Sequence, residues 1–573
     1  MRSFALARLG RSLMVPLALA LPPLLWVSEA TRRASFTTLG RDQGIFQYIA
    51  WALQQGATDY RDVRDVNGPL THLVHLVFLA LGGGDEHRFH SLDLAITGAT
   101  FAIVGACAPG LRAGRAPTWL DRIGWAFAGW VVLSGQYLLY GYWDVAQRES
   151  FFDWFMLPSM ALQVVGHARW QSAQRQTRLL ALVGGLSVIP WFGKPTYALF
   201  TLLQLTVIAF DDGLRTSRKK ALLAFSTGAA LGAATQIAFV VSYGDVQAYA
   251  HIQALDVPAM YRFIWPRAAS DIFSDPWRAT QAIFALTGAV VLLALVWLGE
   301  MPRRVLGVAL APLSALVGVV AQAKGFPYHF HPVTATTHLQ WLIFAAWIAE
   351  RARFAQRRWA MARLVPVCVA VGFALRIATV MEDSPYMRAV WLLWAGNPRW
   401  RETREYFARF PEPDFFPFEL RQAADYLRRH TDPVDRVQTY GMDPYLLFLA
   451  RRRSATPYIY AYDLNADAAL AGGTGGRPNE TQQAHILAIR EANEADMLAR
   501  LETQPPAAFV FIDGSPLLSE ADAWNDFEEH CSKAASWVRA RYRETASFGH
   551  DHIWMRIHRP TGDQEPTEHE PDD

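Results

Sequence analysis

GRDQGIFQYIAWALQQGATDYRDVRDVNGPLTHLVHL occupies residues 40–76 and separates the first apolar run of the chain from those that follow. Its first half is amphipathic, because apolar side chains recur at helical spacing at Ile45, Tyr48, Ile49 and Leu53. Its second half is rich in charged groups, which are costly inside a lipid bilayer. We therefore expect a segment that lies on a membrane surface between membrane-embedded helices.

The composition on either side of this stretch is uneven. The 573 residues are 52% hydrophobic and 18% charged, with a mean hydropathy of +0.08. This average is too polar for a pure membrane bundle and too apolar for a single soluble domain. Most of the apolar residues lie in runs within 12–380, whereas 410–573 is charged and ends in an acidic tail. The expected membrane-spanning runs are 12–27, 91–108, 123–140, 151–167, 179–193, 196–211, 221–242, 277–299, 305–322, 333–349 and 365–380.

The basic residues predict the orientation of these spans. One alternate set of short loops, which includes the N-terminus, holds 20 Lys and Arg, and the opposite set holds 5. By the positive-inside rule the first set is cytoplasmic, which predicts a multi-pass membrane protein with its N-terminus in the cytoplasm. The net charge of +2 carries no nucleic-acid signature. The three cysteines are too few for a disulfide framework and indicate no metal or thiol chemistry.

The apolar stretch 69–83 needs a separate interpretation. At ~1.5 Å per residue it reaches roughly 22 Å, less than the ~30 Å of the hydrocarbon core. The charge pattern also requires the loops 28–68 and 84–90 to lie on the same outer side. We therefore expect a helix in the outer leaflet, eleven true crossings and a periplasmic C-terminal domain. The alternative is a short genuine span with a locally broken charge rule.

The expected domains follow from these patterns. Residues 1–380 form the membrane domain with its first outer loop at 28–90, and 381–417 form an interfacial linker with Trp391, Trp394 and Trp400. Residues 418–560 form an α/β domain, and 561–573 a disordered acidic tail. Helices are expected at 418–430, 445–450 and 522–542, and strands at 436–440, 507–512 and 552–557. The glycine-rich stretch 471–480 lacks phosphate-loop spacing and is interpreted as a mobile loop.

The first outer loop resembles a known family. An acidic residue after the first span, a surface helix and then Gly-x-x-x-Tyr-Arg-Asp-Val-x-Asp-x-x-Gly-Pro-Leu resemble the first periplasmic loop of the GT-C glycosyltransferases, which include aminoarabinose and protein O-mannosyl transferases. The matching residues are Gly56, Tyr60, Arg61, Asp62, Asp65, Gly68, Pro69 and Leu70. The resemblance implies a GT-C-like membrane domain with about eleven crossings, in which Asp42 is the catalytic carboxylate. The other interpretation of Asp42 is a cap of the following helix.

This resemblance also implies a location in the bacterial inner membrane and an activity. The enzyme would move a sugar, with inversion, from a polyprenyl-phosphate carrier to a periplasmic glycan or lipid acceptor of the cell envelope, with Asp42 as base. Its partners would be the lipid-linked donor, the acceptor and membrane lipids, and no nucleic acid. A lipid-linked polysaccharide polymerase or ligase has the same architecture. A transporter is the alternative from another class, although its polar groups belong at mid-membrane and its halves should repeat.

The second outer loop, 141–150, contains the next acidic candidates. Asp144 matches the second acidic residue of the superfamily, and Glu149 competes with it. Oligosaccharyltransferases show an Asp-x-Glu metal pair here, whereas this chain has Asp144-Val-Ala, so a tightly held divalent metal is doubtful and no cofactor is firmly implied. Arg148 is expected to neutralise the donor phosphate, or else to pair with Glu149 on the surface.

Further outer-side residues complete the predicted site. Lys194 interrupts an apolar region and Lys324 lies in the loop 323–332, and both are expected to bind the donor phosphate or to snorkel to the interface. The predicted substrate-binding residues are Glu149, Tyr60, Asp62, Asp65, Tyr328, His329 and His331. The aromatic and basic loop 243–276 suits either a gate over the cavity or a passive interfacial loop.

Overall fold

The computed structural model describes residues 2–111, 117–169, 172–356, 359–381 and 398–557. They divide into two units, one formed by 1–418 with 466–489 and the other by 419–465 with 490–573. The predicted acidic tail, and Trp391 and Trp394 of the predicted linker, lie outside the described residues.

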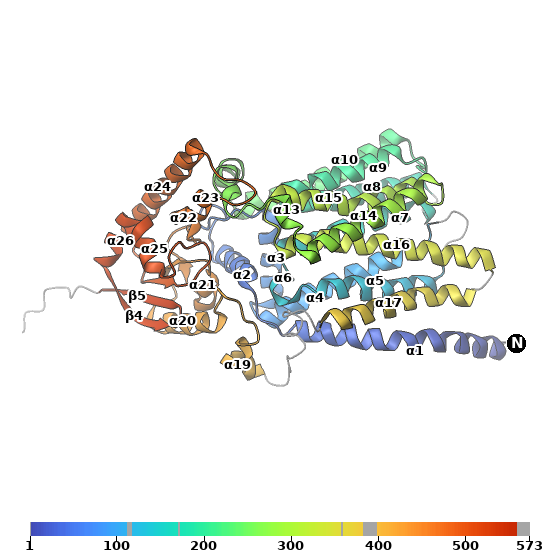
Figure 1. The fold of residues 1–573 in the computed structure, drawn as a ribbon, viewed down its shortest axis with the longest axis horizontal. Coiled ribbons are helices and arrows are strands. Elements are labelled where there is room, and N and C mark those ends of the chain that lie inside the picture. The colour runs from blue at the N-terminus through green and yellow to red at the C-terminus, as the bar shows by residue number, and fades with distance from the viewer. Residues whose placement is uncertain (1, 112–116, 170–171, 357–358, 382–397, 558–573) are drawn as a thin grey trace, which may run out of the picture. The chain divides into compact units, whose positions relative to one another are not determined.

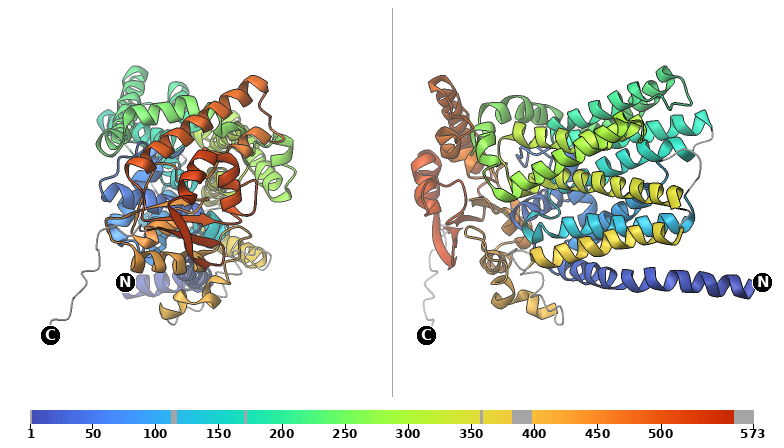
Figure 2. Two further views of the ribbon diagram at one scale, coloured as in Figure 1. Left: turned by 90° about the vertical axis from the view of Figure 1, so that its left-hand side faces the viewer. Right: turned by 45° about the vertical axis from the view of Figure 1, so that its right-hand side comes forward.

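The first unit is a bundle of long helices that run side by side (Figures 1 and 2). Each predicted span coincides with a helix, so the multi-pass helical fold is confirmed. Within the described ranges, five helices are long and apolar enough to cross a membrane by length and composition, and the number of crossings remains a prediction. The long helices are α1 (Arg2–Ala34), α4 (Glu86–Cys107), α5 (Trp119–Leu138), α7 (Arg148–Arg169), α8 (Ala173–Val188), α9 (Ala198–Phe210), α10 (Arg218–Tyr243), α14 (Pro276–Trp297), α15 (Leu306–Gln322), α16 (His331–Gln356) and α17 (Trp359–Met381).

Small residues let these helices approach closely. A Cβ added at Gly129 of α5 would lie 2.6 Å from the Cα of Gly105 in α4. Likewise, a Cβ added at Gly228 of α10 would lie 2.8 Å from the Cα of Ala181 in α8. Backbone contact of this kind is how membrane helices associate, since lipid tails are as apolar as leucine and supply no hydrophobic drive.

Short elements gather at one end of the bundle, where Figure 1 places α2, α3, α6 and α13. They include α2 (Arg41–Gln54), α3 (Pro69–Gly82), α6 (Gly141–Asp144), α11 (Val246–His251), α13 (Ala269–Ile272), η1 (Ile189–Phe192), η2 (Pro195–Tyr197) and η6 (Pro327–Phe330). The predicted surface helix is therefore present as α2. It is buried almost all round rather than along one face, which is why its polar Gln43 and Gln47 are also enclosed.

The helix α3 matches the predicted 69–83 segment. It begins with Pro69 at its first position and ends at Gly83, whose φ of 67° is the left-handed conformation that favours glycine. Immediately afterwards, the ring of His87 donates to the carbonyl of Ser35 at 2.7 Å and stacks on Phe36. Since Ser35 directly follows α1, both ends of α3 lie near the bundle end reached by the C-terminus of α1. This arrangement supports a helix that does not cross.

The second unit contains a five-stranded sheet of order β2-β1-β3-β5-β4 (Figure 2). The strands are β1 (Arg436–Tyr440), β2 (Arg453–Ser454), β3 (Ala508–Ile512), β4 (Tyr542–Phe548) and β5 (Asp551–Arg556), and β1 is parallel to both neighbours. The β3–β5 and β4–β5 pairs are antiparallel. The second unit also contains α21 (Tyr445–Ala450), α20 (Pro417–His430) from residue 419 onward and α24 (Glu480–Thr503) from residue 490 onward. The predicted α/β class is confirmed, while α24, β2 and β4 had not been predicted.

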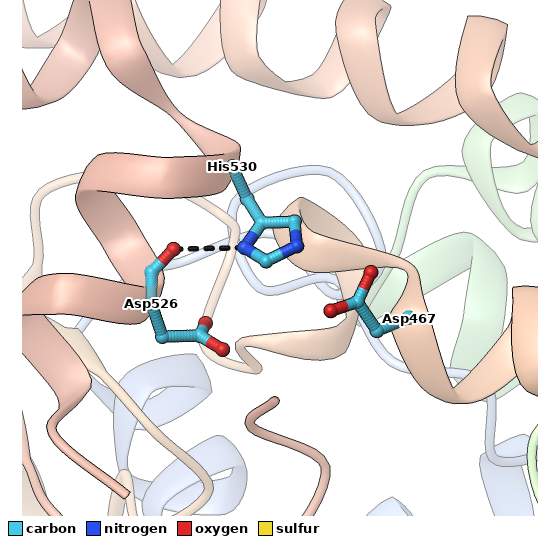
Figure 3. Close-up of side chains that lie close together, drawn as sticks. All are labelled: Asp467, Asp526 and His530. Atoms are coloured by element: carbon cyan, nitrogen blue, oxygen red, sulfur yellow. Dashed lines mark hydrogen bonds between the residues drawn. The ribbon is translucent and has the colours of Figure 1, made fainter. Parts of the chain in front are cut away.

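The predicted helix 522–542 is wrong in its extent. It is two helices, α25 (Ala523–His530) and α26 (Ser532–Arg539), separated by Cys531 with φ −125° and ψ 53°. Near this break the carboxylate of Asp526 is fully buried and accepts hydrogen bonds from Tyr440 at 2.5 Å and from Ser519 at 2.7 Å. The ring of His530 donates to the Asp526 carbonyl at 2.9 Å (Figure 3). The bond from Tyr440 to Asp526 joins α25 to β1.

Candidate active site

The helices α2 and α6 are joined directly at the crowded end of the bundle. The side-chain amide of Gln43, in the first turn of α2, donates to the carbonyl of Tyr142 at 3.0 Å and also to that of Val145. Both carbonyls flank Asp144, the last residue of α6. The residue next to Gln43 is Asp42, so this bond brings the two predicted acidic residues into one site.

Asp42 is half-buried, and its carboxylate is the first acidic group of the site. Among the described residues, none forms a hydrogen bond or an ion pair with its carboxylate, whereas the adjacent Arg41 is held by Asp414 at 3.1 Å. Burial raises the pKa of Asp42, and the positive charges of Arg148 and Arg41 oppose this rise. A carboxylate kept free, and next to cations that favour its charged form, is suited to accept a proton.

Asp144 has a different environment. Its side chain is buried, with one carboxylate oxygen that has no partner among the described residues. Burial raises its pKa well above the usual value, and the neighbouring charge of Asp42 adds to the effect. Two nearby carboxyl groups resist simultaneous ionisation, so the more deeply buried one keeps its proton. The two acids therefore suit different roles, with Asp42 as the ionised member.

A buried cluster of charges lies on the first turn of α7 and the loops opposite it. The Nζ of Lys194 is 2.5 Å from Oε1 of Glu149 and 3.1 Å from Nε2 of His329, and it also contacts Gln322. The Nε of Arg148 lies 3.8 Å from Oε2 of Glu149. One glutamate thus faces two cations, so these three groups together carry one positive charge, and the ionised Asp42 beside Arg148 balances it.

The aromatic and histidine residues predicted for this site surround the cluster. The Nη2 of Arg148 donates to the Tyr328 hydroxyl at 3.2 Å. His331 donates to the carbonyl of Asp144 at 2.8 Å and stacks on Tyr140 with centroids 3.7 Å apart. Burial and the neighbouring Lys194 lower the pKa of His329 far below its usual value, so this ring is neutral and accepts from Lys194.

Lys324, predicted as a phosphate ligand, is engaged elsewhere in this structure. Its ammonium donates to the carbonyl of Tyr261 at 3.0 Å and to that of Ile264, and it lies 4.8 Å from the centre of the Tyr261 ring. Burial, followed by repulsion from Lys194, lowers its pKa to about 7. Lys324 therefore binds carbonyl groups of the outer loop 243–276, and its predicted role in binding the donor phosphate remains a prediction.

The first-loop residues predicted to bind substrate are bonded within the loop. Tyr60 is buried in a left-handed conformation and donates to the carbonyl of Asn67 at 3.1 Å. Asp62 accepts from the backbone of Thr58 at 2.8 Å. Both oxygens of Asp65 accept from Asn67, and one also meets His72. These contacts indicate structural roles, and the substrate-binding role predicted for the three residues remains a prediction.

The sequence analysis did not single out two residues of this loop, Asp59 and His72. The ring of His72 lies between Asp59 and Asp65, with both nitrogens on carboxylate oxygens. The spacing from Asp65 to His72 carried no helical or metal-ligand signal, because the two side chains meet across the turn that begins α3. The only available signal was a polar histidine in an apolar run, which is costly unless paired.

The residues that could hold a divalent cation are few. Glu149 is committed to Lys194, which leaves Asp42 and Asp144 as the carboxylates of this site. Two such ligands are fewer than the six to eight oxygens that Ca²⁺ takes, so solvent and substrate would have to supply the rest.

The structure was compared with known proteins. No family model and no curated protein sequence matches the chain. ArnT from Cupriavidus metallidurans bound to undecaprenyl phosphate is similar, with a TM-score of 0.52 at 13% identity over 96% of this chain and 99% of that one. Its apo state gives a TM-score of 0.51 at 13% identity over 96% and 98%. The apo oligosaccharyltransferase of Archaeoglobus fulgidus gives 0.41 at 12% identity over 87% and 69%.

The chain has the GT-C fold. The likeness to ArnT spans almost the whole of both chains and includes the C-terminal unit, so the family resemblance carried by the first outer loop is confirmed for the fold. At 13% identity the likeness is one of fold alone, and activity has to be argued from the site. The GT-C fold here places Asp42, Asp144, Arg148, Glu149 and Lys194 at one end of the bundle.

Proposed function

We propose that this protein is an inverting glycosyltransferase that moves a sugar from a polyprenyl-phosphate carrier to a periplasmic glycan or lipid acceptor of the cell envelope. The observation that carries the proposal is the free carboxylate of Asp42 beside two buried cations, Arg148 and Lys194. A base next to an anion site is what displacement at a glycosyl phosphate requires.

The chemistry assigns each group a step. The Asp42 carboxylate takes the proton of the acceptor hydroxyl, whose oxygen forms a bond to the anomeric carbon. The bond from that carbon to the phosphate oxygen breaks, and its electron pair leaves with the polyprenyl phosphate. Arg148 and Lys194 stabilise the charge that develops on this phosphate. Attack opposite the leaving group inverts the anomeric centre.

The membrane location explains the choice of donor. A polyprenyl carrier keeps its tail in the bilayer and presents its phosphate at the surface, where the cluster lies. The distribution of basic loop residues supports an outer, periplasmic position for this end of the bundle, with the N-terminus in the cytoplasm. ArnT, which has the same fold, was crystallised with undecaprenyl phosphate, and this agrees with a lipid-phosphate donor.

The test uses purified full-length protein with radiolabelled polyprenyl-phosphate pentoses and hexoses. Asp42→Asn should reduce sugar transfer or donor hydrolysis by on the order of 100- to 10,000-fold, the range that general-base catalysis supplies. Asp425→Asn, which changes an exposed carboxylate of α20, is the matched control and should leave the rate unchanged. Undiminished transfer by Asp42→Asn removes Asp42 as the base. Failure of every donor removes the glycosyltransferase and favours a transporter.

A further inference from the structure

The first outer loop contains a buried carboxylate–histidine–carboxylate triad. The Nδ1 of His72 lies 2.7 Å from Oδ2 of Asp59, and its Nε2 lies 2.8 Å from Oδ2 of Asp65. All three side chains are fully buried. A neutral imidazole has one N–H donor, so bonds from His72 to two ionised carboxylates require the imidazolium. Charged hydrogen bonds between buried groups are strong and hold their partners in one geometry.

The triad fixes the turn that leads into α3. The side-chain amide of Asn67 donates to both carboxylate oxygens of Asp65, at 2.8 and 3.0 Å. The backbone carbonyl of Asn67 accepts a hydrogen bond from the Tyr60 hydroxyl. Gly68 follows Asn67 and precedes the first residue of α3. His72 lies in the first turn of the same helix, so Gly68 is held from both sides.

Gly68 lies directly against the segment that carries Lys194. Its φ of −77° and ψ of 161° suit any residue, so its backbone conformation does not require glycine. A Cβ added at Gly68 would, however, collide with the carbonyl oxygen of Phe192. It would also lie 2.9 Å from the carbonyl carbon of Phe192 and 3.0 Å from the carbonyl oxygen of Gly193. Only glycine lets the two backbones approach this closely.

The opposite side of the same segment is equally tight. A Cβ at Gly193 would run into the ring of Phe152, which packs edge-on against Tyr197 with centroids 4.7 Å apart. The backbone at 192–194 is thus held between Gly68 and Phe152. A shift of this backbone would move the ammonium of Lys194, which lies 2.5 Å from Glu149.

We propose that Gly68 and His72 are positioning residues that set where the Lys194 ammonium meets the donor phosphate. His72 holds the turn, the turn holds Gly68 against Phe192, and this contact places Lys194. The inference rests on the proposed function, in which Lys194 binds that phosphate. Neither residue touches the substrate.

A double-mutant cycle tests the proposal with KM and kcat measured separately for a polyprenyl-phosphate sugar. Lys194→Ala should raise the donor KM by on the order of 10- to 100-fold, the worth of a charged hydrogen bond. Gly68→Ala and His72→Gln should each raise KM roughly tenfold in the wild-type background, and less than about twofold when Lys194 is already alanine. Gly372→Ala is the matched control, because an added Cβ there meets no atom within 4 Å.

The outcomes separate the two claims. If Lys194→Ala leaves KM unchanged, the phosphate-binding role in the proposed function fails. In a second outcome, Lys194→Ala raises KM, and Gly68→Ala and His72→Gln raise KM by the same factor with or without Lys194. In that case only the positioning role fails. An unchanged KM in both variants also overturns it. If either variant elutes as an unfolded protein, Asn67→Ala, which removes only the bonds to Asp65, replaces it in the cycle.

Discussion

The ammonium of Lys194 lies 2.5 Å from the carboxylate of Glu149, and the glutamate side chain is fully buried while that of the lysine is 16% exposed. Burial lowers the pKa of Lys194 to about 8, although the charge of Glu149 opposes the decrease. A lysine with an ordinary pKa of 10.5 stays charged throughout the neutral pH range. Lys194, in contrast, loses its proton as the pH rises just above neutral.

This pKa predicts an alkaline limit to activity. Lys194 must be protonated to bind phosphate, so kcat/KM should fall as the pH rises through about 8. Lys194→Arg should remove this limit, because arginine stays charged at any accessible pH. The measurement is kcat/KM against pH for both proteins. A wild-type profile that stays level to pH ~10 would contradict the lowered pKa, since that is the behaviour of an ordinary lysine.

An acidic limit should come from Asp42. This group must be ionised to accept a proton, and burial raises its pKa while Arg148 and Arg41 counteract the rise. The value of kcat/KM should therefore fall as the pH drops through this raised pKa. Arg148→Gln removes one of the opposing charges, so the acidic limb should move to higher pH, in addition to a lower overall rate. An acidic limb at the same pH in both proteins would assign it to a group other than Asp42.

The sequence predicted the helices well because their signals are local. Apolar runs of the right length define the bundle, and the predicted strands at 436–440, 507–512 and 552–557 have their counterparts in β1, β3 and β5. The elements that were missed have weak local signals. β2 is two residues long, and β4 has mostly exposed polar side chains. The break at Cys531 lies within a continuous helical pattern that carries no local signal for it.

The sequence predicted which residues gather in the candidate site, but it did not predict which of them contact one another. The family-like motif pointed to Asp42, and the outer loops supplied Glu149 and Lys194, all of which meet at one end of the bundle. No pattern in a linear sequence, however, indicates that Lys324 bonds loop carbonyls or that His72 joins two aspartates. Such contacts between distant segments depend on the tertiary packing of the loops.

The glycine-rich stretch predicted to be mobile is held against the outer loop. Gly475 donates to the carbonyl of Pro266 at 2.8 Å, and Thr474 accepts from Ala268 at 3.1 Å. A Cβ at Gly475 would lie 2.7 Å from the carbonyl carbon of Arg267, so Gly475→Ala should loosen this contact at a cost of about 1–3 kcal/mol. We expect faster tryptic cleavage at Arg267 than in the Gly372→Ala control. Equal cleavage rates would show that the stretch does not restrain the loop.

The last prediction concerns whether α3 crosses the membrane. Its 14 residues span about 21 Å at ~1.5 Å each, less than the ~30 Å core, and His87 just beyond its end bonds Ser35. In a background with the three cysteines replaced, Arg88→Cys should react with a membrane-impermeant maleimide added from the periplasmic side. Arg215→Cys, in a basic loop predicted to be cytoplasmic, should react only after permeabilisation. If Arg88→Cys behaves like Arg215→Cys, α3 is a true span, and the C-terminal unit lies on the cytoplasmic side unless another predicted crossing is lost.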